Sequence, residues 1–382
     1  MTRQAANEPI KVGFVLLSNS RHPIASTRIT ALNMFSFLRA AHFAPHIVFE
    51  PPRATETPEV SGLAPSLMAE GFRIVFFQKV HGPSVEALAR ELSDAGISTV
   101  YSVCDLVKTT MAEATRVTIT VTDYLKSLYP LELQPKIRVV HDGIERPDVC
   151  KTTWRADRGS HRNPLRAVLV TSEPLHELPL IGELPEWLEV EIVGPYAPAG
   201  ERLRRVREAR WKLTTRNGWR ERLAYLRFLA NRRIRRVAWD PVGVYERMKQ
   251  ADIGIIPIDT SPGPEPGESS PRWKVKSENR LTMKMAMGLP VIATPIPAYE
   301  SVMEHGQSGF FARSRGDWTE YLDALRDPVY RRTIGERARE SVLARFSKEA
   351  QADRLIAILE RMTQSDASSP GSKHIDQGRS QV

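Results

Sequence analysis

A cluster of basic residues stands immediately before a predicted helix in the second half of the chain. Lys274, Lys276 and Arg280 surround the point where an apolar helical periodicity begins, near residue 279. Free N–H groups and the helix dipole favour anions at such a point, so the pattern predicts a site for a phosphate group. An ordinary helix–strand unit with solvated lysines accounts for the local chemistry equally well.

The predicted helix has recognisable ends. Ser277 and Asn279 are residue types that cap a helix N-terminus, and Gly288 is a typical C-terminal stop. Pro290 then opens a short buried strand, Val291–Thr294. The order loop, helix, glycine and strand is typical of an α/β unit that positions a ligand-binding loop.

Polar residues also follow the predicted strands of the first half. Ser26, Thr27 and Arg28 follow the first strand, and a second group follows the third and fourth strands: Gln78, Lys79, His81 and Asp105. Ligands bind at the carboxyl ends of strands in open parallel sheets, so these residues are predicted to face a cleft. Ser26 or Thr27 can instead simply cap a helix, and the others can be strand-end or surface residues. Arg28 is less easily explained in that way, because cations are disfavoured near a helix N-terminus.

The elements that must position these residues form two sets of alternating strands and helices. This alternation predicts an α/β fold with two Rossmann-like, doubly wound parallel-sheet domains. The predicted strands are Ile10–Leu17, Pro45–Phe49, Arg73–Phe77, Thr99–Cys104, Val117–Val121 and Ile137–Val140 in the first set, and Val168–Thr171, Val190–Val193, Arg236–Trp239, Asp252–Pro257, Val291–Thr294 and Gly309–Ala312 in the second.

We therefore expect two domains facing each other across a cleft. The first covers residues 1–148 and the second residues 165–345, with a linker over 149–164 that is poor in apolar residues. Residues 346–362 are helical in period and are expected to pack back on the first domain. Residues 363–382 are polar and are predicted to be disordered.

The composition bounds the compartment and the class of protein. The chain has 382 residues, 41% of them hydrophobic and 26% charged, which is typical of a globular protein. No apolar run is long enough to span a bilayer, and the first residues lack the apolar core of a signal peptide. Only two cysteines occur, so we expect a cytoplasmic protein that holds no metal through them.

The net charge of +9 is concentrated in one insert, residues 200–236. It contains 14 Lys and Arg against three Glu, a local charge of +11, so the rest of the chain carries −2. Apolar residues at helical spacing predict two basic amphipathic helices joined at Asn217-Gly218, with Leu223, Leu226, Ala230 and Ile234 on the apolar side of the second. They could lie on an anionic membrane surface, or form a solvated hairpin packed on their own domain. No aromatic-basic motif of a known module supports nucleic-acid binding.

The ordered motifs over residues 237–311 resemble the donor-binding half of a GT-B glycosyltransferase of the retaining group 1, or GT4, type. The matching positions are Asn279-Arg280, the run from Ala286 to Ala293 with its Gly-Leu-Pro-Val-Ile-Ala order, Glu300, and Gly309-Phe310-Phe311. A helix followed by a strand over residues 244–257 also matches. No single tetrapeptide is specific, but the ordered set is.

The resemblance implies transfer of a sugar from a nucleotide-diphosphate-sugar to an acceptor of a cell-envelope glycan or glycolipid, with retention and without a metal or other cofactor. Arg280 would stabilise the leaving diphosphate, because a guanidinium donates two N–H groups at once. Asp105 or His81 would orient the acceptor hydroxyl, with Ser26, Thr27, Arg28, Gln78 and Lys79 on the acceptor side. The donor site would contain Lys274, Lys276, Ser277, Glu278, Asn279, Arg280, Pro295, Ile296, Tyr299 and Glu300.

The chain departs from the family pattern at the donor site. Two glutamates that usually bracket the loop and helix are replaced by Val275 and Met283, which cannot accept a hydrogen bond from a sugar hydroxyl. Glu278 is a nearby substitute for one of them, and the orientation of Lys284 on the same helix is open. The basic residue that the family places after the first strand of the second domain is also absent, unless His176 replaces it.

Two alternatives to a membrane-associated transferase follow. The first is a catalytically silent relative that binds a nucleotide-sugar or glycan as a scaffold. The second is a protein that binds anionic surfaces through its basic insert. The missing glutamates favour the scaffold, whereas the Asn279-Arg280 pair and the intact strand that follows oppose it.

Overall fold

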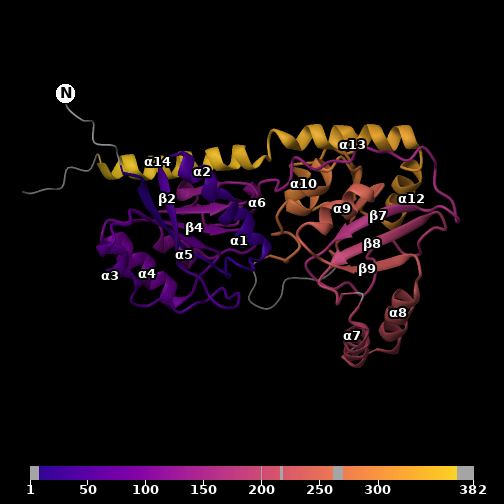
Figure 1. The fold of residues 1–382 in the computed structure, drawn as a ribbon, viewed down its shortest axis with the longest axis horizontal. Coiled ribbons are helices and arrows are strands. Elements are labelled where there is room, and N and C mark those ends of the chain that lie inside the picture. Colours follow the sequence, from indigo (N-terminus) through magenta and orange to yellow (C-terminus); the bar gives the residue numbers. More distant parts are fainter. Residues whose placement is uncertain (1–7, 199, 216–217, 261–269, 368–382) are drawn as a thin grey trace, which may run out of the picture.

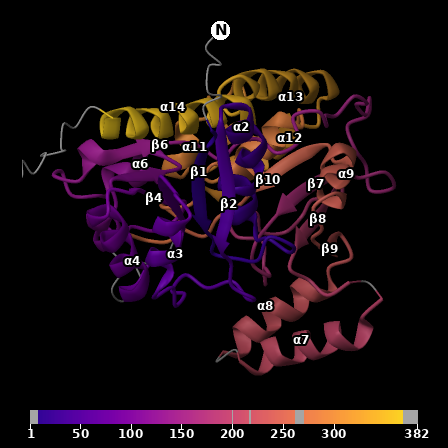
Figure 2. The same ribbon diagram turned by 60° about the vertical axis from the view of Figure 1, so that its left-hand side comes forward.

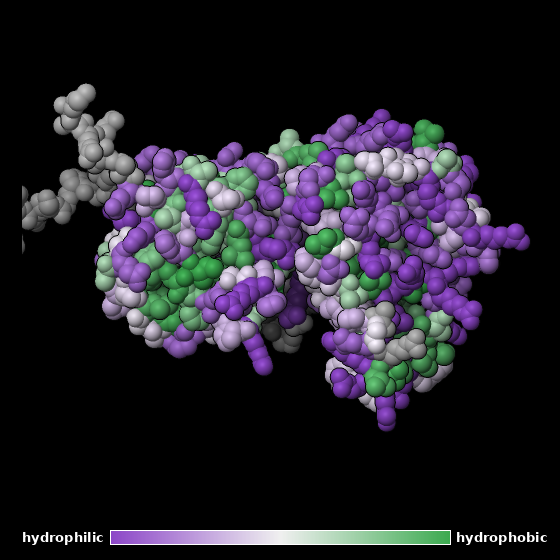
Figure 3. All heavy atoms as spheres, in the orientation of Figure 1, coloured by the Kyte–Doolittle hydropathy of each residue, from purple (hydrophilic) through white to green (hydrophobic). Residues whose placement is uncertain are grey.

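A computed structural model of the chain describes residues 8–198, 200–215, 218–260 and 270–367. Two lobes lie side by side, each built around a six-stranded parallel sheet with helices on its faces (Figure 1). The space-filling view shows a notch between the lobes (Figure 3). The predicted two-domain α/β fold is confirmed.

The first sheet has the strand order β2-β1-β3-β4-β5-β6. Every position of β3 and β4 is buried, as is typical of parallel strands covered on both faces. The direction of strand addition reverses between β1 and β3, the place where open sheets form ligand crevices. The elements are β1 (Ile10–Val15), α1 (Ala25–Thr30), η1 (Leu32–Met34), α2 (Phe35–Ala40), β2 (Phe43–Phe49), α3 (Leu63–Ala69), β3 (Ile74–Gln78), α4 (Pro83–Asp94), β4 (Ser98–Val103), α5 (Thr109–Ala114), β5 (Val117–Thr120), α6 (Asp123–Ser127), η2 (Gln134–Lys136) and β6 (Ile137–Val139).

The second sheet has the order β12-β11-β10-β7-β8-β9, which reverses between β7 and β10. Its β7 and β10 strands run parallel and bring the loops after them together. The elements are β7 (Leu165–Val170), β8 (Leu188–Gly194), α7 (Arg202–Thr214), α8 (Trp219–Ala230), β9 (Ile234–Ala238), α9 (Gly243–Gln250), β10 (Ile253–Ile256), α10 (Asn279–Ala286), β11 (Val291–Ala293), α11 (Pro297–Glu300), β12 (Phe310–Phe311), α12 (Arg315–Ala324), α13 (Pro328–Leu343) and α14 (Lys348–Ala367).

The chain crosses between the lobes twice at one place. The first crossing follows β6, and the second joins α13 to α14, where the Ile144 backbone N–H donates to the Phe346 carbonyl at 2.8 Å. Both views show α13 and α14 along the same side of the two lobes (Figure 2). Helix α14 packs Leu355 and Leu359 into the core of the first sheet, whereas α13 packs against α10 in the second lobe.

The segment predicted as a linker, residues 149–164, lies along the second lobe. The Lys151 backbone N–H donates to the Met287 carbonyl at 2.8 Å. The fully buried Arg331 of α13 donates to the Arg155 and Asp157 carbonyls at 2.8 and 3.1 Å. The change of lobe therefore occurs earlier, at residues 141–145.

Two local predictions were wrong. Helix α14 continues to Ala367, so residues 363–367 are helical where disorder was predicted, because the helical pattern continues past the last apolar position; residues 368–382 lie outside the described part. In the insert, Ile234 begins β9 and does not belong to the second helix, which ends at Ala230. On that helix Leu223 and Leu226 are exposed, and Tyr225 and Phe228 pack into the core. The two predicted helices form as α7 and α8, although Asn217 of the connecting turn is not described.

Candidate active site

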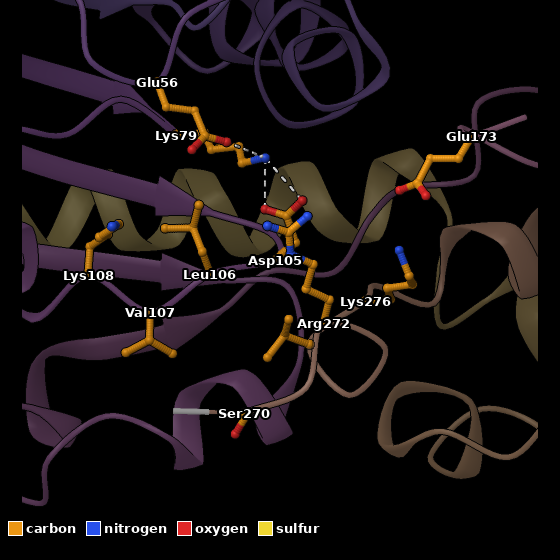
Figure 4. Close-up of a pocket in the computed structure, with 11 residues that line it drawn as sticks. Glu56, Lys79, Asp105, Leu106, Val107, Lys108, Glu173, Ser270, Arg272 and Lys276 are labelled. Carbon is orange, nitrogen blue, oxygen red and sulfur yellow. Dashed lines mark hydrogen bonds and ion pairs between the residues drawn. The ribbon is translucent and has the colours of Figure 1, made fainter. Parts of the chain in front are cut away.

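A cavity of about 480 Å³ lies between the two lobes (Figure 4). The first lobe contributes the loops after β2, β3 and β4, and the second contributes the loop after β7 and the loop before α10. These are the loops at the carboxyl ends of the strands, where parallel sheets bind ligands. The lining residues are Glu56, Lys79, Asp105, Leu106, Val107, Lys108, Glu173, Ser270, Arg272, Val275 and Lys276.

Lys79 is the centre of the first-lobe side of this cavity. Its ammonium group contacts Asp105 Oδ1 at 2.8 Å and Glu56 Oε1 at 3.0 Å. Burial lowers the pKa of Lys79, but the nearby Cys104, Asp105 and Glu56 together raise it by a larger amount, so the net shift of the pKa is upward. Lys79 also has a φ of 57°, the left-handed region that a side chain rarely adopts outside functional or strained sites.

His81 lies behind this group and does not line the cavity. Its Nε2 is 3.6 Å from Glu56 Oε2, and its backbone N–H donates to the Glu56 carbonyl at 2.7 Å. The neighbouring His81 side chain lowers the pKa of Glu56 to about 2, burial opposes that shift, and the charge of Lys79 adds to it. His81 therefore contacts Glu56, which the sequence analysis missed, and reaches the cavity only through it.

The predicted acceptor-side residues after β1 are held within the protein. Thr27 is buried and donates from Oγ1 to Gln78 Oε1 at 2.8 Å, and Gln78 is buried as well. Ser26 is the second residue of α1, and neither it nor Thr27 caps that helix: the N-cap is Ile24, without a side-chain bond. The capping expectation was wrong because α1 begins two residues earlier than the serine position would require.

Arg28 joins the lobes. Its guanidinium donates to both carboxylate oxygens of Glu145 at 2.6 and 2.9 Å, and it lies 5.5 Å from the ring of Trp239 in the second lobe. The hydrogen bond to Glu145 raises the pKa of Arg28, against the effect of burial. A bidentate pair of this kind fixes both partners geometrically, so Arg28 positions the segment where the chain changes lobe.

The second-lobe side of the cavity is basic. Lys276 and Arg272 line it from the loop before α10, and in Figure 4 the Arg272 side chain extends toward Asp105. Burial lowers the pKa of Lys276, and the charge of Arg280 lowers it further. Lys274 lies in the same loop with its ammonium 5.3 Å from the Trp273 ring, and it does not line the cavity.

Arg280 is the second residue of α10 and points to the loop after β7. Its Nη2 donates to Ser172 Oγ at 2.6 Å, next to the cavity-lining Glu173. Arg280, the residue predicted to bind a diphosphate, therefore lies at the edge of the interlobe cavity. Lys284, one turn along the helix, is fully buried and donates to the Arg280 carbonyl at 3.1 Å. Burial lowers the pKa of Lys284 to about 7, and it lies under the site, away from the cleft.

The start of α10 contacts the interlobe crossing. Glu278 is buried, and its Oε1 lies 3.0 Å from His141 Nδ1 and accepts from the Asp142 backbone N–H at 3.3 Å. Ser277 hydrogen-bonds to Asp142, whose pKa burial raises to about 7, with the charge of Glu278 adding to that shift. Neither Ser277 nor Asn279 caps α10, because Glu278 is the N-cap residue and makes no side-chain cap bond. Gly288 ends the helix region with a φ of 85°, as predicted.

The remaining predicted donor residues surround α11. Pro295 is partly buried; Ile296 and Tyr299 are core residues, and the Tyr299 hydroxyl has no hydrogen-bond partner within the described chain. Burial raises the pKa of Tyr299 to about 12; Arg280 lowers it and Glu278 raises it, so this ring lies close to the start of α10. Glu300 is exposed and lies 3.5 Å from Arg313.

The cavity contains residues that sequence reasoning did not single out: Glu56, Lys108, Glu173 and Arg272. Arg272 had a signal, since it continues the basic spacing of Lys274 and Lys276. Glu56 had none, because it stands in a loop without a motif. Among the residues the structure describes, no group of three or more His, Cys, Asp or Glu side chains has the arrangement of a metal site.

Comparison with known proteins shows what the chain resembles. Residues 178–357 match the family model described as glycosyl transferase-like. N-acetyl-alpha-D-glucosaminyl L-malate synthase of Bacillus anthracis is 39% identical over 73 residues, a match that spans 18% of this chain and only 19% of the synthase. The residues matched by the family model include most of the second lobe and the whole of α10, where the predicted donor site lies.

Solved structures extend the likeness to both lobes. HepE of Anabaena, in complex with UDP, superposes with a TM-score of 0.62 at 14% identity over 92% of this chain and 100% of that one. Sucrose-phosphate synthase of Thermosynechococcus elongatus gives 0.62 at 12% identity over 93% and 100%. A glycosyltransferase of Rickettsia africae gives 0.64 at 12% identity over 93% and 99%.

The fold is therefore GT-B, the two-lobed architecture of these structures. The match to the glycosyl transferase-like model covers 180 of the 382 residues, somewhat less than half of the chain. The retaining GT4-type assignment stays a prediction.

Proposed function

We propose that the protein transfers a glycosyl group from a nucleoside-diphosphate sugar to an acceptor held between the lobes. One observation carries the proposal: Arg280 and Lys276 meet at the start of α10, at the edge of the interlobe cavity. Neither forms an ion pair with a carboxylate in the part of the chain that the structure describes. Two cations of this kind at a helix N-terminus are a site for a diphosphate.

The proposed chemistry is stabilisation of a leaving group. As the sugar–phosphate bond breaks, negative charge grows on the diphosphate, and Arg280 and Lys276 would balance it where it develops. Closure of the lobes would hold donor and acceptor together. On the opposite side, Asp105 lines the cavity and can accept a hydrogen bond from an acceptor hydroxyl. HepE, which shares the fold, is described in complex with UDP and with UDP-glucose, which supports a nucleotide-sugar donor.

Three finer parts of the proposal come from the family resemblance. They are retention of the anomeric configuration, activity without a metal, and an acceptor that belongs to a cell-envelope glycan or glycolipid. Each has a direct test. NMR of the product made from a donor of known anomeric form reports retention or inversion. Activity after chelation and dialysis reports the metal requirement.

The first experiment is a thermal-shift panel at equal ionic strength with UDP, GDP, ADP, dTDP and CMP and their sugar conjugates. A donor that binds the folded state raises the melting temperature by mass action, so one base should stabilise the protein more than the others. Slow hydrolysis of the stabilising donor, followed as nucleotide release, should then accompany binding. Equal response to all nucleotides would leave no specific donor site and would contradict the proposal.

A catalytically silent binding protein is the second candidate function. Val275 lines the cavity and Met283 lies on α10, at the two places where the family resemblance implies glutamates. Glu278 does not replace them at the cavity, because it is buried against His141 and Asp142. Donor-specific stabilisation without nucleotide release, in the presence of candidate acceptors, would favour this reading.

A further inference from the structure

The helical hairpin formed by α7 and α8 presents apolar side chains to solvent. On α8, Trp219, Leu223 and Leu226 are all exposed, and Trp219 is 70% exposed. Their spacing of four and three residues places them on one face of the helix. Tyr225 and Phe228 on the opposite face are buried and attach the hairpin to the second lobe. The exposed stripe is therefore not needed to hold the hairpin in place.

Helix α7 repeats this arrangement. Leu203 is 88% exposed, and Val206 and Trp211 are also exposed, although both line a cavity next to the loop after β7. In Figure 1 the hairpin projects from the second lobe below β9, and in Figure 3 apolar residues gather on that projection among hydrophilic ones. Two tryptophans and four aliphatic residues exposed on one small projection are unusual for a surface that faces only water.

Arginines flank the apolar residues. Arg207 and Arg210 on α7, and Arg220 and Arg227 on α8, are exposed and form no ion pair within the described residues. Arg220 instead lies 5.5 Å from the ring of Trp219. The insert over residues 201–236 has a net charge of +11, whereas the rest of the chain has −2. The positive charge is thus concentrated beside the exposed tryptophan and leucine side chains.

The hairpin is adjacent to the proposed active site. A second cavity of about 470 Å³ is lined by Val206 and Trp211 of the hairpin and by Pro174 and Leu175 of the loop after β7. The preceding residue of that loop, Glu173, lines the interlobe cavity. A surface that bound the hairpin would therefore hold the donor side of the cleft close to it.

We propose that the α7–α8 hairpin is a docking surface for an anionic lipid bilayer. Its tryptophans and leucines would enter the boundary between headgroups and acyl chains, while its arginines would bind lipid phosphates. Nucleic acid fits this surface less well, because exposed leucines gain nothing from a phosphate backbone. In the part of the chain that the structure describes, no helix is long and apolar enough to cross a membrane. Docking would thus place the protein on the bilayer surface, whatever reaction the cleft performs.

The test is sedimentation of the full chain with vesicles of phosphatidylcholine alone and of phosphatidylcholine mixed with phosphatidylglycerol, at fixed ionic strength. We expect binding to the mixed vesicles, about tenfold weaker for the variant W219S/L223S/L226S and about tenfold weaker for R220Q/R227Q. Added salt should weaken wild-type binding. The substituted positions are exposed, so the fold should be retained, which circular dichroism and the melting temperature check.

One matched control variant separates the hairpin from exposed apolar surface in general. Leu131 in the first lobe is 82% exposed and Val329 on α13 is 73% exposed, so L131S/V329S removes comparable surface elsewhere and should bind like the wild type. Undiminished binding of the W219S/L223S/L226S variant would overturn the proposal. So would equal binding to neutral vesicles, or no wild-type binding to either kind. Binding that the control variant also loses would assign the surface to another part of the chain.

Discussion

The two sides of the interlobe cleft hold their cations differently. In the first lobe, Lys79 contacts Asp105 and Glu56, and Arg28 forms a bidentate pair with Glu145. In the second lobe, among the described residues, the Arg280 guanidinium donates only to the hydroxyl of Ser172, and Lys276 has no ion pair. The first set is neutralised within the protein, whereas the second keeps its charge available for an anion.

The pKa shifts follow the same division. Carboxylates and Cys104 outweigh burial at Lys79 and raise its pKa. At Lys276, burial and the neighbouring Arg280 both lower the pKa. A bound diphosphate would stabilise the charged form of Lys276 and raise its pKa. At Lys79 the same diphosphate would have to compete with the carboxylates that already contact the ammonium group. A basic residue in a cleft is therefore informative about ligands only when its internal partners are known.

The largest expected effect comes from Arg280→Ala. The guanidinium would be lost from the leaving diphosphate, so donor-induced stabilisation should disappear and turnover should fall by about a hundredfold. Without ligand the melting temperature should barely change, because only the bond to Ser172 is lost. Arg332→Ala, which removes an exposed arginine of α13 paired with Glu336, is the control and should behave as wild type. A large loss of stability without ligand would make Arg280 a structural residue.

The second prediction contrasts the two lysines that line the cavity. Lys276→Met should weaken donor binding by about tenfold and leave stability nearly unchanged, since a single charge-assisted contact is removed. Lys79→Met should leave Asp105 and Glu56 facing each other and lower the melting temperature by roughly 3 °C, with a smaller change in donor affinity. Titration calorimetry and thermal denaturation measure both quantities. The comparison fails if the two variants lose donor affinity equally.

The smallest expected effect lies where the two lobes meet. Burial beside Glu278 raises the pKa of Asp142 from its ordinary 3.8 to about 7 in the folded protein. The folded state therefore binds this proton more tightly, and the contribution of Asp142 to stability falls as pH rises between those values. The variant Asp142→Asn cannot ionise at this position, so it does not lose stability as the pH rises. The melting temperature of the variant minus that of the wild type should therefore be roughly 3 °C larger at about pH 8 than at about pH 4. Parallel pH profiles for the two proteins would show that Asp142 does not titrate in this way.

The sequence by itself determined the architecture. Runs of Val, Ile and Phe at strand length, separated by helical periods, mark both parallel sheets, because buried strands must be apolar on both faces. The sequence also indicated the basic loop before α10 and the polar residues after β3 and β4 as candidate site residues. The reason is that the carboxyl ends of parallel strands lie at the same edge of a sheet. The two basic helices of the insert were recognisable from their period, although Ile234, which was placed on the second helix, begins β9.

Only the tertiary structure decided which charges are neutralised. Glu278 meets His141 across 137 residues of sequence, and Arg28 meets Glu145 across 117. Glu56 stands in a loop without a motif, yet it contacts both Lys79 and His81. Pairing depends on where loops of different strands converge and how deeply each side chain is buried, and neither quantity is encoded in local spacing. For that reason the sequence indicated which basic residues belong to the cleft. The tertiary structure showed which of them contact carboxylates and which remain available to bind a ligand.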